Sequence, residues 1–144
     1  MNHKKTNILV VGGAGYIGSH MCKCLAQAGY QPVVLDNLVY GHRQAVQWGP
    51  FIKGSLDDTE LLNYIFKTHD IAAVMHFAAF TYVGESVQNP AMYYQNNVAA
   101  TLTLLNSMIQ AEVKNFIFSS SCAVYGEPVE IPMNEDHPFH PINP

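Results

Sequence analysis

The sequence predicts an α/β fold built on a doubly wound parallel sheet that carries helices on both faces. Two observations support this fold class. Up to residue 119, short apolar runs alternate with segments of helical periodicity. The apolar runs are continuous rather than interrupted by polar residues, which is typical of strands that are buried on both faces. Right-handed crossovers between such strands give the strand order 3-2-1-4-5.

The first half of the chain predicts strands over residues 7–12, 31–36 and 50–54. A helix is expected between the first two, over 15–28, because apolar residues recur there with helical spacing and Gly29 is a natural end for it. The residues expected on its packed face are Ile17, Met21, Cys24 or Leu25, and Ala28.

The second half predicts two more strands, over 72–78 and 115–119, with the last one at an edge of the sheet. Asp57 and Glu60 have the spacing of a capping box, so a helix is expected to begin there. A longer helix is expected from Asn89-Pro90, with Pro at its first helical position, to about residue 111. The side chains expected to be buried are Leu61, Leu62, Ile65 and Phe66 in the first helix, and Tyr94, Val98, Leu102, Leu105 and Ile109 in the second.

The composition excludes several classes of protein. The chain has 144 residues, enough for one domain, of which 49% are hydrophobic and 12% charged, with a net charge of −4. No Lys or Arg lies between Lys67 and Lys114, which argues against nucleic acid as a partner, because phosphate binding needs a basic face. The apolar run after Asn7 is too short for a signal peptide or a membrane span. We therefore expect a cytoplasmic protein with no membrane partner.

The cysteines and histidines predict no metal site. Cys22, Cys24 and Cys122 have no metal-ligand spacing and are expected to be buried free thiols in a reducing compartment. The seven histidines are scattered along the chain. His76 lies inside an apolar run and is expected to be a core histidine rather than a ligand.

The stretch Gly12-Gly13-Ala14-Gly15-Tyr16-Ile17-Gly18, between the first strand and the first helix, is the most informative part of the sequence. Gly12 can turn at positive φ, Gly15 has no Cβ to block a ligand, and Gly18 lets the helix lie close to the strand. The helix N-terminus then points free N–H groups at a pyrophosphate. The pattern predicts a dinucleotide site of the Rossmann type.

Asp36, which ends the second apolar run, sharpens this prediction. A carboxylate there can accept hydrogen bonds from both ribose hydroxyls of an adenine nucleotide, and it repels a 2′-phosphate. NAD is therefore expected rather than NADP. Two alternatives stay open: Asp36 is the N-cap of a helix, or Arg43 accommodates the 2′-phosphate of NADP.

Residues that follow the other strands are further candidates, because ligands of open α/β sheets bind beyond the carboxyl ends of the strands. Ser55-Leu56 follows the third strand, Phe77-Ala78-Ala79-Phe80-Thr81 the fourth, and 119–126 the fifth. For the last two segments, core packing and an ordinary strand-end loop remain alternatives. Asn96 is a poor choice inside a helix, so it either holds the cofactor or satisfies a neighbouring loop.

These motifs resemble the extended short-chain dehydrogenase/reductase family, and within it the UDP-glucose 4-epimerase branch. They span nearly the whole chain in the order that the family has them. The matching segments are GGAGYIGSH at 12–20, DNL at 36–38, HFAA at 76–79, VGESV at 83–87, YYQNNV at 93–98 and NFIFSSSCAVYG at 115–126.

The resemblance implies an NAD site in which residues 36–41 surround the adenosine end and Ser55-Leu56 flank the adenine. It also implies a UDP-sugar substrate and a catalytic role for Ser121. The cofactor residues are expected to be Gly12, Gly15, Tyr16, Ile17, Gly18, Asp36, Asn37, Leu38, Ser55, Leu56, Phe77, Ala78, Ala79, Phe80, Thr81, Asn96 and Ser119, and the substrate residues Thr81, Ser121 and Ala123.

The activity that the resemblance implies is 4-epimerisation of UDP-glucose and UDP-galactose by transient oxidation at C4, as part of galactose metabolism. NAD does the redox work, and Ser121 matches the serine that helps a catalytic tyrosine polarise the 4-hydroxyl of the sugar. The whole protein is expected to be a homodimer, as members of the family usually are.

The sequence departs from the family in three places. Thr81 stands where the family has a lysine, so a UDP-pentose such as UDP-arabinose or UDP-xylose is an alternative substrate. Ser55 replaces an aspartate that often lies at the adenine. The Tyr-x-x-x-Lys motif that supplies the general base does not occur in the sequence.

We therefore expect residues 1–124 to form an NAD-binding Rossmann domain that is truncated after the fifth strand. Residues 125–144 hold five of the eight prolines, and they are expected to form a loop that leads to a missing Tyr-x-x-x-Lys helix and substrate domain. Such a fragment is expected to be inactive alone. The alternatives are a nucleotide-sugar dehydratase or decarboxylase of the same family, and a non-catalytic NAD-binding module.

Overall fold

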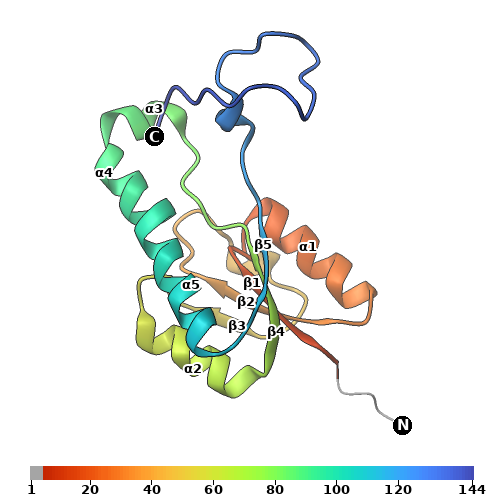
Figure 1. The fold of residues 1–144 in the computed structure, drawn as a ribbon. Helices are drawn as coiled ribbons and strands as arrows, with labels where there is room; N and C mark the ends of the chain where they lie inside the picture. The colour runs from red at the N-terminus through yellow and green to blue at the C-terminus, as the bar shows by residue number, and fades with distance from the viewer. Residues whose placement is uncertain (1–4) are drawn as a thin grey trace.

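The protein, in a computed structural model that describes residues 5–144, has a parallel sheet between two layers of helices (Figure 1). The order β3-β2-β1-β4-β5 confirms the predicted topology, and every neighbouring pair is parallel. The expectation about an N-terminal leader rests partly on residues 1–4, which lie outside the described residues. The strands are β1 (Asn7–Val11), β2 (Gln31–Asp36), β3 (Phe51–Lys53), β4 (Ile71–His76) and β5 (Asn115–Phe118).

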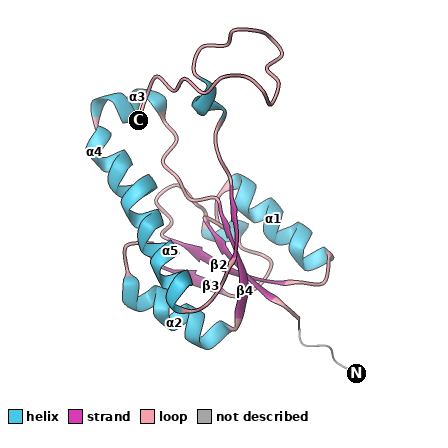
Figure 2. Cartoon of the chain, viewed as in Figure 1, coloured by secondary structure: helices cyan, strands magenta, loops and turns pink. Residues whose placement is uncertain are grey.

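The side chains of β1 alternate between two apolar cores, one on each face of the sheet. Leu9 and Val11 face the core that also holds helices α2 (Thr59–His69) and α5 (Ala100–Gln110). Ile8 and Val10 face the core that holds α1 (Tyr16–Gln27). Figure 2 shows α1 on one side of the sheet and the other two helices on the opposite side. Burial on both faces explains why the strand is a continuous apolar run.

Helix α1 packs through a face that only partly matches the predicted one, which included Met21 and Leu25. Its buried residues are Gly18 and Cys22, and Met21 and Leu25 flank them in the core. Gly18 packs directly against the turn after β1, so a Cβ at this position would overlap the carbonyl oxygen of Gly12. The residues of the predicted face that are exposed instead are Ile17, Cys24 and Ala28.

Helix α2 begins one residue later than predicted. Asp58 rather than Asp57 is the N-cap, and its Oδ1 accepts a hydrogen bond from the Leu61 backbone N–H at 2.9 Å. Glu60 therefore falls within the first turn, where a carboxylate favours the helix dipole without closing a capping box. The buried residues are Leu62, Ile65 and Phe66, as predicted, and Leu61 is partly buried.

The long helix predicted after Asn89 is built from three consecutive segments: α4 (Pro90–Tyr93), the π-helical η2 (Tyr94–Ala99) and α5. Pro90 occupies the first helical position, as predicted. The predicted buried face is wrong, because the helix carries two apolar stripes and helical periodicity alone does not say which one meets the sheet. The stripe that meets it is Tyr93, Ala100, Leu104 and Met108, whereas Tyr94, Val98, Leu102 and Ile109 are 49–74% exposed and Leu105 is partly buried.

The remaining segments are short or irregular: η1 (Arg43–Ala45), α3 (Val83–Gln88), η3 (Cys122–Tyr125) and the proline-rich tail. The predicted loop of residues 125–144 has neither strand nor helix from Gly126 onward, and Tyr125 ends η3. Within it, buried His137 accepts a hydrogen bond at Nε2 from the Val129 N–H at 2.9 Å, and its ring packs against Tyr125. β5 is an edge strand, and the side chains of Ile117 and Phe118 are each more than half exposed.

Candidate functional site

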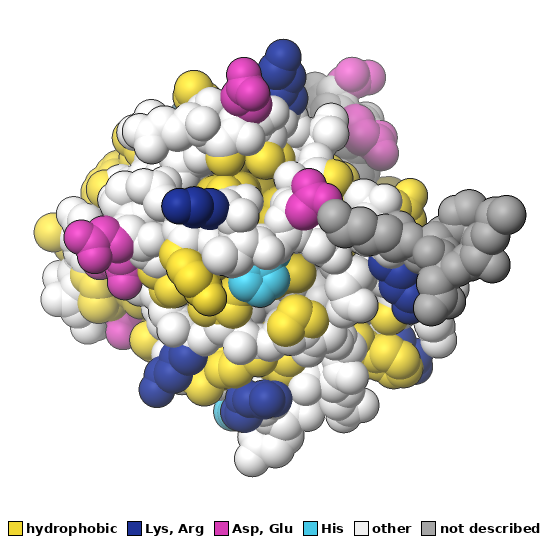
Figure 3. All heavy atoms as spheres, turned by 90° about the horizontal axis from the view of Figure 1, so that it is seen from below, with side chains coloured by type: hydrophobic (Ala, Val, Ile, Leu, Met, Phe, Trp, Pro, Cys, Tyr) yellow, Lys and Arg dark blue, Asp and Glu magenta, His cyan; other side chains and the backbone are white. Residues whose placement is uncertain are grey.

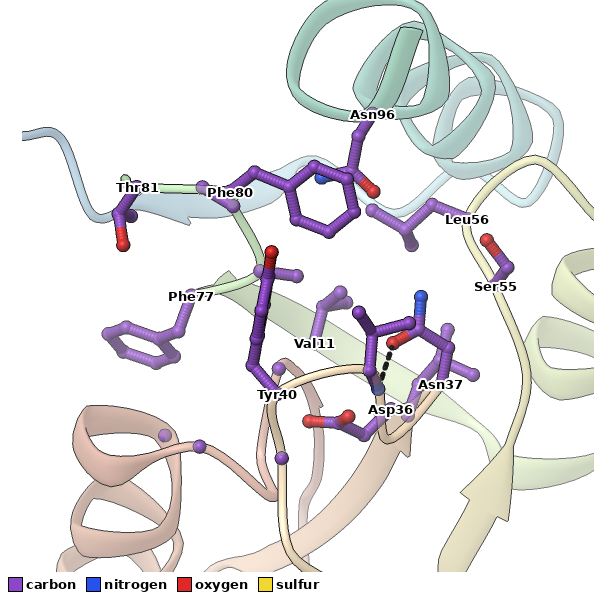
Figure 4. Close-up of a pocket in the computed structure, with 18 of the residues that line it drawn as sticks. Val11, Asp36, Asn37, Tyr40, Ser55, Leu56, Phe77, Phe80, Thr81 and Asn96 are labelled. Carbon is purple, nitrogen blue, oxygen red and sulfur yellow. Dashed lines mark hydrogen bonds between the residues drawn. The ribbon is translucent and has the colours of Figure 1, made fainter. Parts of the chain in front are cut away.

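A cleft of about 320 Å³ opens beyond the carboxyl ends of β1, β2 and β4 (Figure 4). Its walls are the turn after β1, the loop after β2 and the loop after β4. The predicted site residues that line it are Gly12, Gly15, Tyr16, Ile17, Gly18, Asp36, Asn37, Ser55, Leu56, Phe77, Ala78, Ala79, Phe80, Thr81 and Asn96. It is also lined by Val11, Leu35, Val39, Tyr40, Gly41, Gly54 and Tyr82, of which the sequence analysis placed only 39–41 near a ligand.

The turn after β1 can only be made by glycine at its key position. Gly12 has a φ of +76°, and a Cβ there would lie 2.7 Å from the backbone N of Ala78. Gly15 then serves as the N-cap of α1 and provides no side-chain acceptor for the first-turn amides. These amides therefore lack a side-chain cap and can serve as donors to an anion.

The Asp36 carboxylate joins two walls of the cleft. Its Oδ2 accepts a hydrogen bond from the Ala14 N–H at 2.9 Å, and its Oδ1 accepts one from the Leu38 N–H at 2.8 Å. Gly41 packs so closely that a Cβ there would lie 2.7 Å from Oδ1. Each carboxylate oxygen keeps acceptor capacity beyond these bonds. Asp36 is not a helix N-cap, because His42 takes that position before η1.

The Arg43 side chain is not placed to bind the 2′-phosphate of NADP. Its Nη1 donates to the Val46 carbonyl oxygen at 3.3 Å, and its guanidinium lies 4.8 Å from the centre of the Phe51 ring. Arg43 does not line the cleft. The Asp36 carboxylate therefore faces the cleft without a cationic partner from this residue.

The loop after β4 is held by the π-helical segment. The Asn97 side chain accepts from the Phe80 N–H at 2.9 Å and donates to the Phe80 carbonyl oxygen at 3.0 Å. Asn96 lines the cleft and donates to Asn97 Oδ1 at 2.9 Å. Polar groups of a helix that departs from α geometry are thus aimed at a functional loop, as is frequent for π segments.

His76 is a core histidine, as predicted. Its side chain is 2% exposed, its Nε2 lies 3.2 Å from Thr101 Oγ1, and its ring packs against Phe118 at 5.4 Å. Burial lowers the pKa of His76, so the neutral ring is favoured. Because Thr101 Oγ1 donates to the Asn97 carbonyl oxygen at 2.8 Å, His76 also supports the segment that holds Phe80.

Four predicted site residues lie outside the lining of the cleft. Leu38 adopts a left-handed conformation with φ of 64° and contributes its backbone N–H to Asp36. Ser119 continues the β5–β4 pairing through a bond from its N–H to the His76 carbonyl oxygen at 3.1 Å. Ser121 is exposed, and its Oγ accepts from the Ala123 N–H at 3.2 Å at the start of η3.

The structure also shows a contact across the cleft that the sequence did not reveal. Tyr40, from the loop after β2, lies 3.3 Å from Oε2 of Glu85 in α3, and its ring packs on Phe80 and Tyr82. Glu85 belongs to a segment that the family resemblance had already singled out. Its partner could not be read from the sequence, because the two residues are far apart along the chain.

The cysteines are only partly as predicted. Cys22 is buried, and burial raises its pKa to about 11, but Cys24 and Cys122 are exposed. Among residues 5–144, no group of three or more His, Cys, Asp or Glu side chains could hold a metal ion. In the same part of the chain no helix is long and apolar enough to cross a membrane. On the face in Figure 3, Lys and Arg side chains stand apart from one another.

Comparison with known proteins gives a family. The model of the NAD dependent epimerase/dehydratase family matches residues 8–144. A UDP-glucose 4-epimerase of Rhizobium meliloti is 53% identical over 141 residues, which are 98% of this chain and 43% of that protein. The chain thus spans about two fifths of the length of the curated relatives that it matches.

Solved structures agree with this result. The crystal structure of UDP-glucose 4-epimerase from Brucella ovis in complex with NAD has a TM-score of 0.91 and 51% sequence identity, over 96% of this chain and 42% of that one. The enzyme from Stenotrophomonas maltophila, solved with NAD and formylated UDP-arabinopyranose, has a TM-score of 0.90 and 35% identity, over 96% and 44% of the two chains.

Proposed function

The chain belongs to the NAD dependent epimerase/dehydratase family, and we propose that it forms the cofactor-binding part of an NAD-dependent UDP-sugar 4-epimerase, an isomerase. One observation carries the proposal. The Gly12 turn and the Asp36 carboxylate meet through the Ala14 N–H at one edge of the sheet. The identity of 53% to a UDP-glucose 4-epimerase supports the choice of reaction.

The residues of the cleft fit NAD on their own geometry. The close approach of Gly12 to the β4 loop leaves a cradle that a Cβ would fill, and the uncapped amides of α1 suit a pyrophosphate. Asp36 keeps acceptor capacity for the ribose hydroxyls. We propose that Ser55 and Leu56 flank the adenine, and that the segment from Phe77 to Thr81 and Asn96 line the rest of the cofactor.

Calorimetric titration of the chain with NAD and with NADP tests this assignment. We expect NAD to bind and NADP to bind at least about tenfold more weakly, because Asp36 repels a 2′-phosphate. Asp36→Asn should narrow that preference, while Asp57→Asn, on an exposed carboxylate outside the cleft, should leave it unchanged. Equal affinity of the parent chain for both cofactors would contradict the assignment.

When bound, NAD would supply the hydride acceptor and donor for C4 of the sugar. We propose that the Ser121 hydroxyl contacts the 4-hydroxyl, with Thr81 and Ala123 beside the substrate. Ser121 Oγ accepts the Ala123 N–H, which leaves its own proton free to be donated. The 144 residues contain no Tyr-x-x-x-Lys, so we propose that this chain binds NAD and does not epimerise a UDP-sugar alone.

An assay of UDP-glucose and UDP-galactose interconversion tests that statement, with an active UDP-glucose 4-epimerase as the positive control. We expect no turnover from the purified chain at saturating NAD. Turnover above the rate without protein would show that a residue within these 144 acts as the general base. It would also contradict the proposal that the general base is a tyrosine of a Tyr-x-x-x-Lys motif.

A UDP-pentose is the second candidate substrate. Thr81 is neutral and lines the cleft where the family has a lysine, and a structural neighbour was solved with formylated UDP-arabinopyranose. Saturation-transfer NMR with NAD present can compare UDP-glucose, UDP-galactose and UDP-arabinose. A preference for UDP-arabinose that Thr81→Lys reverses would favour the pentose.

We also propose that the whole protein is a homodimer. The apolar stripe of Tyr94, Val98, Leu102 and Ile109 is exposed on the helix that runs through η2 and α5, and it supports a subunit contact there. Analytical ultracentrifugation of the whole protein should show a dimer. Leu102→Glu should dissociate this dimer, whereas Tyr64→Glu, on α2, should leave it intact. A monomer at all concentrations would contradict the proposal.

We further propose a cytoplasmic location and a role in galactose metabolism. The three free cysteines support a reducing compartment. Fractionation of cells that express the tagged chain would test the location. Comparing growth on galactose between cells with and without its gene would test the metabolic role.

A further inference from the structure

Tyr40 crosses the mouth of the cleft. It rises from the loop after β2, beside Asp36, and its ring packs edge-on against Phe80 at 5.4 Å and Tyr82 at 5.3 Å, both in the loop after β4 (Figure 4). Its hydroxyl lies 3.3 Å from Glu85 Oε2. These three contacts all join the Tyr40 side chain to the opposite wall of the cleft.

Glu85 is the fixed end of this contact. The same oxygen, Oε2, also accepts a hydrogen bond from the Tyr93 hydroxyl at 2.7 Å. Tyr93 is 2% exposed, and its hydroxyl oxygen accepts a hydrogen bond from the Tyr82 N–H at 3.2 Å. Its single proton is shared between Glu85 Oε2 and the Tyr82 carbonyl oxygen, which lies 2.9 Å away. Glu85 is thus held by a buried side chain that belongs to the β4 wall.

The two ends of the contact differ in strength. The 2.7 Å bond from Tyr93 is a normal length for a bond to a carboxylate, whereas 3.3 Å from Tyr40 is long for an O–H···O bond. Tyr40 is 45% exposed, and Tyr93 is almost fully buried. Tyr40 is therefore the side that releases first, with Glu85 left in place on the β4 wall.

Both tyrosines remain hydrogen-bond donors at neutral pH. Burial, followed by the Glu85 carboxylate, raises the pKa of Tyr93 to about 12. Desolvation and the same carboxylate raise the pKa of Tyr40. The Glu85 oxygen consequently faces two protonated hydroxyls over the pH range in which a binding assay is run.

We propose that Tyr40 is a gate over the cofactor cleft and that Glu85 is the positioning residue that latches it shut. The inference rests on the proposed function for the identity of the ligand, NAD. Tyr40 lines the cleft and packs on its opposite wall, so a dinucleotide that lies between the Gly12 turn and the β4 loop meets the ring of Tyr40 as it enters or leaves. With the gate in place the cleft measures about 320 Å³, near the small end of the roughly 300–1,000 Å³ typical of ligand pockets.

Stopped-flow measurement of NAD binding and release tests the gate on the intact chain. Tyr40→Phe and Glu85→Gln weaken the latch, so both the association and the dissociation rate constants should rise by roughly 3- to 10-fold. In Glu85→Gln the dissociation constant should change by less than about twofold, because Glu85 does not line the cleft, whereas Tyr40 does. Tyr64→Phe, an exposed tyrosine on α2, is the matched control and should change neither rate.

Two results would overturn the gate. One is a pair of rate constants that stays at the parent value in Tyr40→Phe and in Tyr40→Ala. The other is a rise in the dissociation rate alone, with an equal loss of affinity, in Glu85→Gln, because the hydrogen bond would then stabilise only the bound state.

Amide hydrogen exchange of the chain without NAD tests whether the contact between Tyr40 and Glu85 holds the loop after β2 in place. Glu85→Gln and Tyr40→Phe should speed the exchange of amides in the loop of residues 37–42, where the His42 N–H donates to the Ala14 carbonyl oxygen at 2.9 Å. Unchanged exchange would refute the latch even where NAD binds. Absence of NAD binding in the parent chain, with faster exchange in the variants, would instead refute the proposed function and leave the latch supported.

Discussion

Replacing Gly12 with alanine tests whether the cleft depends on a glycine turn pressed against the β4 loop. Gly12 has a φ of +76°, and a Cβ there would lie 2.7 Å from Ala78 N and 2.8 Å from the carbonyl carbon of Phe77. Both neighbours are backbone atoms, which cannot rotate away as the end of a side chain can. The alanine is therefore opposed by its own conformation and by the wall of the cleft.

A second glycine separates these two costs. Gly29 has a φ of +89°, but nothing lies within 4 Å of its Cβ position. Gly29→Ala therefore incurs a conformational cost of about 1–2 kcal/mol, offset by about 0.4–1 kcal/mol from the stiffer unfolded chain. Gly12→Ala adds overpacking of about 1–3 kcal/mol. We expect the free energy of unfolding to fall by about 2–4 kcal/mol for Gly12→Ala and by less than about 1.5 kcal/mol for Gly29→Ala.

Urea unfolding followed by circular dichroism measures both losses, and calorimetry at a temperature where both variants are folded measures NAD binding. Gly12→Ala should weaken NAD binding by more than about tenfold, since the displaced turn no longer presents the start of α1. Gly29 lies at the far end of α1, so its variant should bind NAD as the parent does. Equal destabilisation of the two variants, or normal NAD affinity in Gly12→Ala, would refute the reasoning.

Three further substitutions probe the polar groups beneath the cleft. Burial lowers the pKa of His76 below 6.5, so between the lowered value and about pH 6.5 only the unfolded state binds a proton at this residue. The free energy of unfolding therefore falls as the pH falls through that window. His76→Gln should remove this pH dependence from urea midpoints measured between about pH 5 and pH 7. The Ser107 hydroxyl is buried and has no hydrogen-bond partner among residues 5–144. Ser107→Ala should therefore raise the free energy of unfolding by about 1 kcal/mol more than Asn106→Ala, on the exposed side of α5, does. An equal change in the two variants would contradict a cost of burying the unpaired hydroxyl. Asn97→Asp loses the donor to the Phe80 carbonyl oxygen and should weaken both the free energy of unfolding and the free energy of NAD binding by about 1–2 kcal/mol each. Unchanged NAD affinity would show that cofactor binding does not need this hydrogen bond.

The fold could be predicted from sequence because its signals are local or nearly so. Continuous apolar runs fixed the strands, and the right-handed crossover rule left one strand order, which the structure confirms. The errors came where two local choices were equivalent. Asp57 and Asp58 are both good N-caps, and in the structure it is Asp58 that accepts the hydrogen bond, from the Leu61 N–H. The helix after Pro90 has two apolar stripes, and the choice depends on which one the sheet meets.

The candidate site could be predicted as a set of positions but not as a set of contacts. The carboxyl-edge rule placed most of the predicted residues around one cleft, since parallel strands end at one edge. It could not show that Asn97 holds the Phe80 loop, because that needs the phase of the helix through its π segment. It also could not show that Tyr40 meets Glu85, because Tyr40 lies on a loop and Glu85 on a short helix 45 residues further along the chain.

A few side chains hold the walls of the cleft together. Asp36 ties the glycine turn to the loop after β2 and still has acceptor capacity, and Asn97 holds the β4 loop while it positions Asn96. Removing either one must therefore change stability together with affinity. Tyr40 and Glu85 differ, because their contact crosses the cleft and supports neither core. A change confined to the rates of cofactor exchange is consequently the property that separates the latch from the rest of the site.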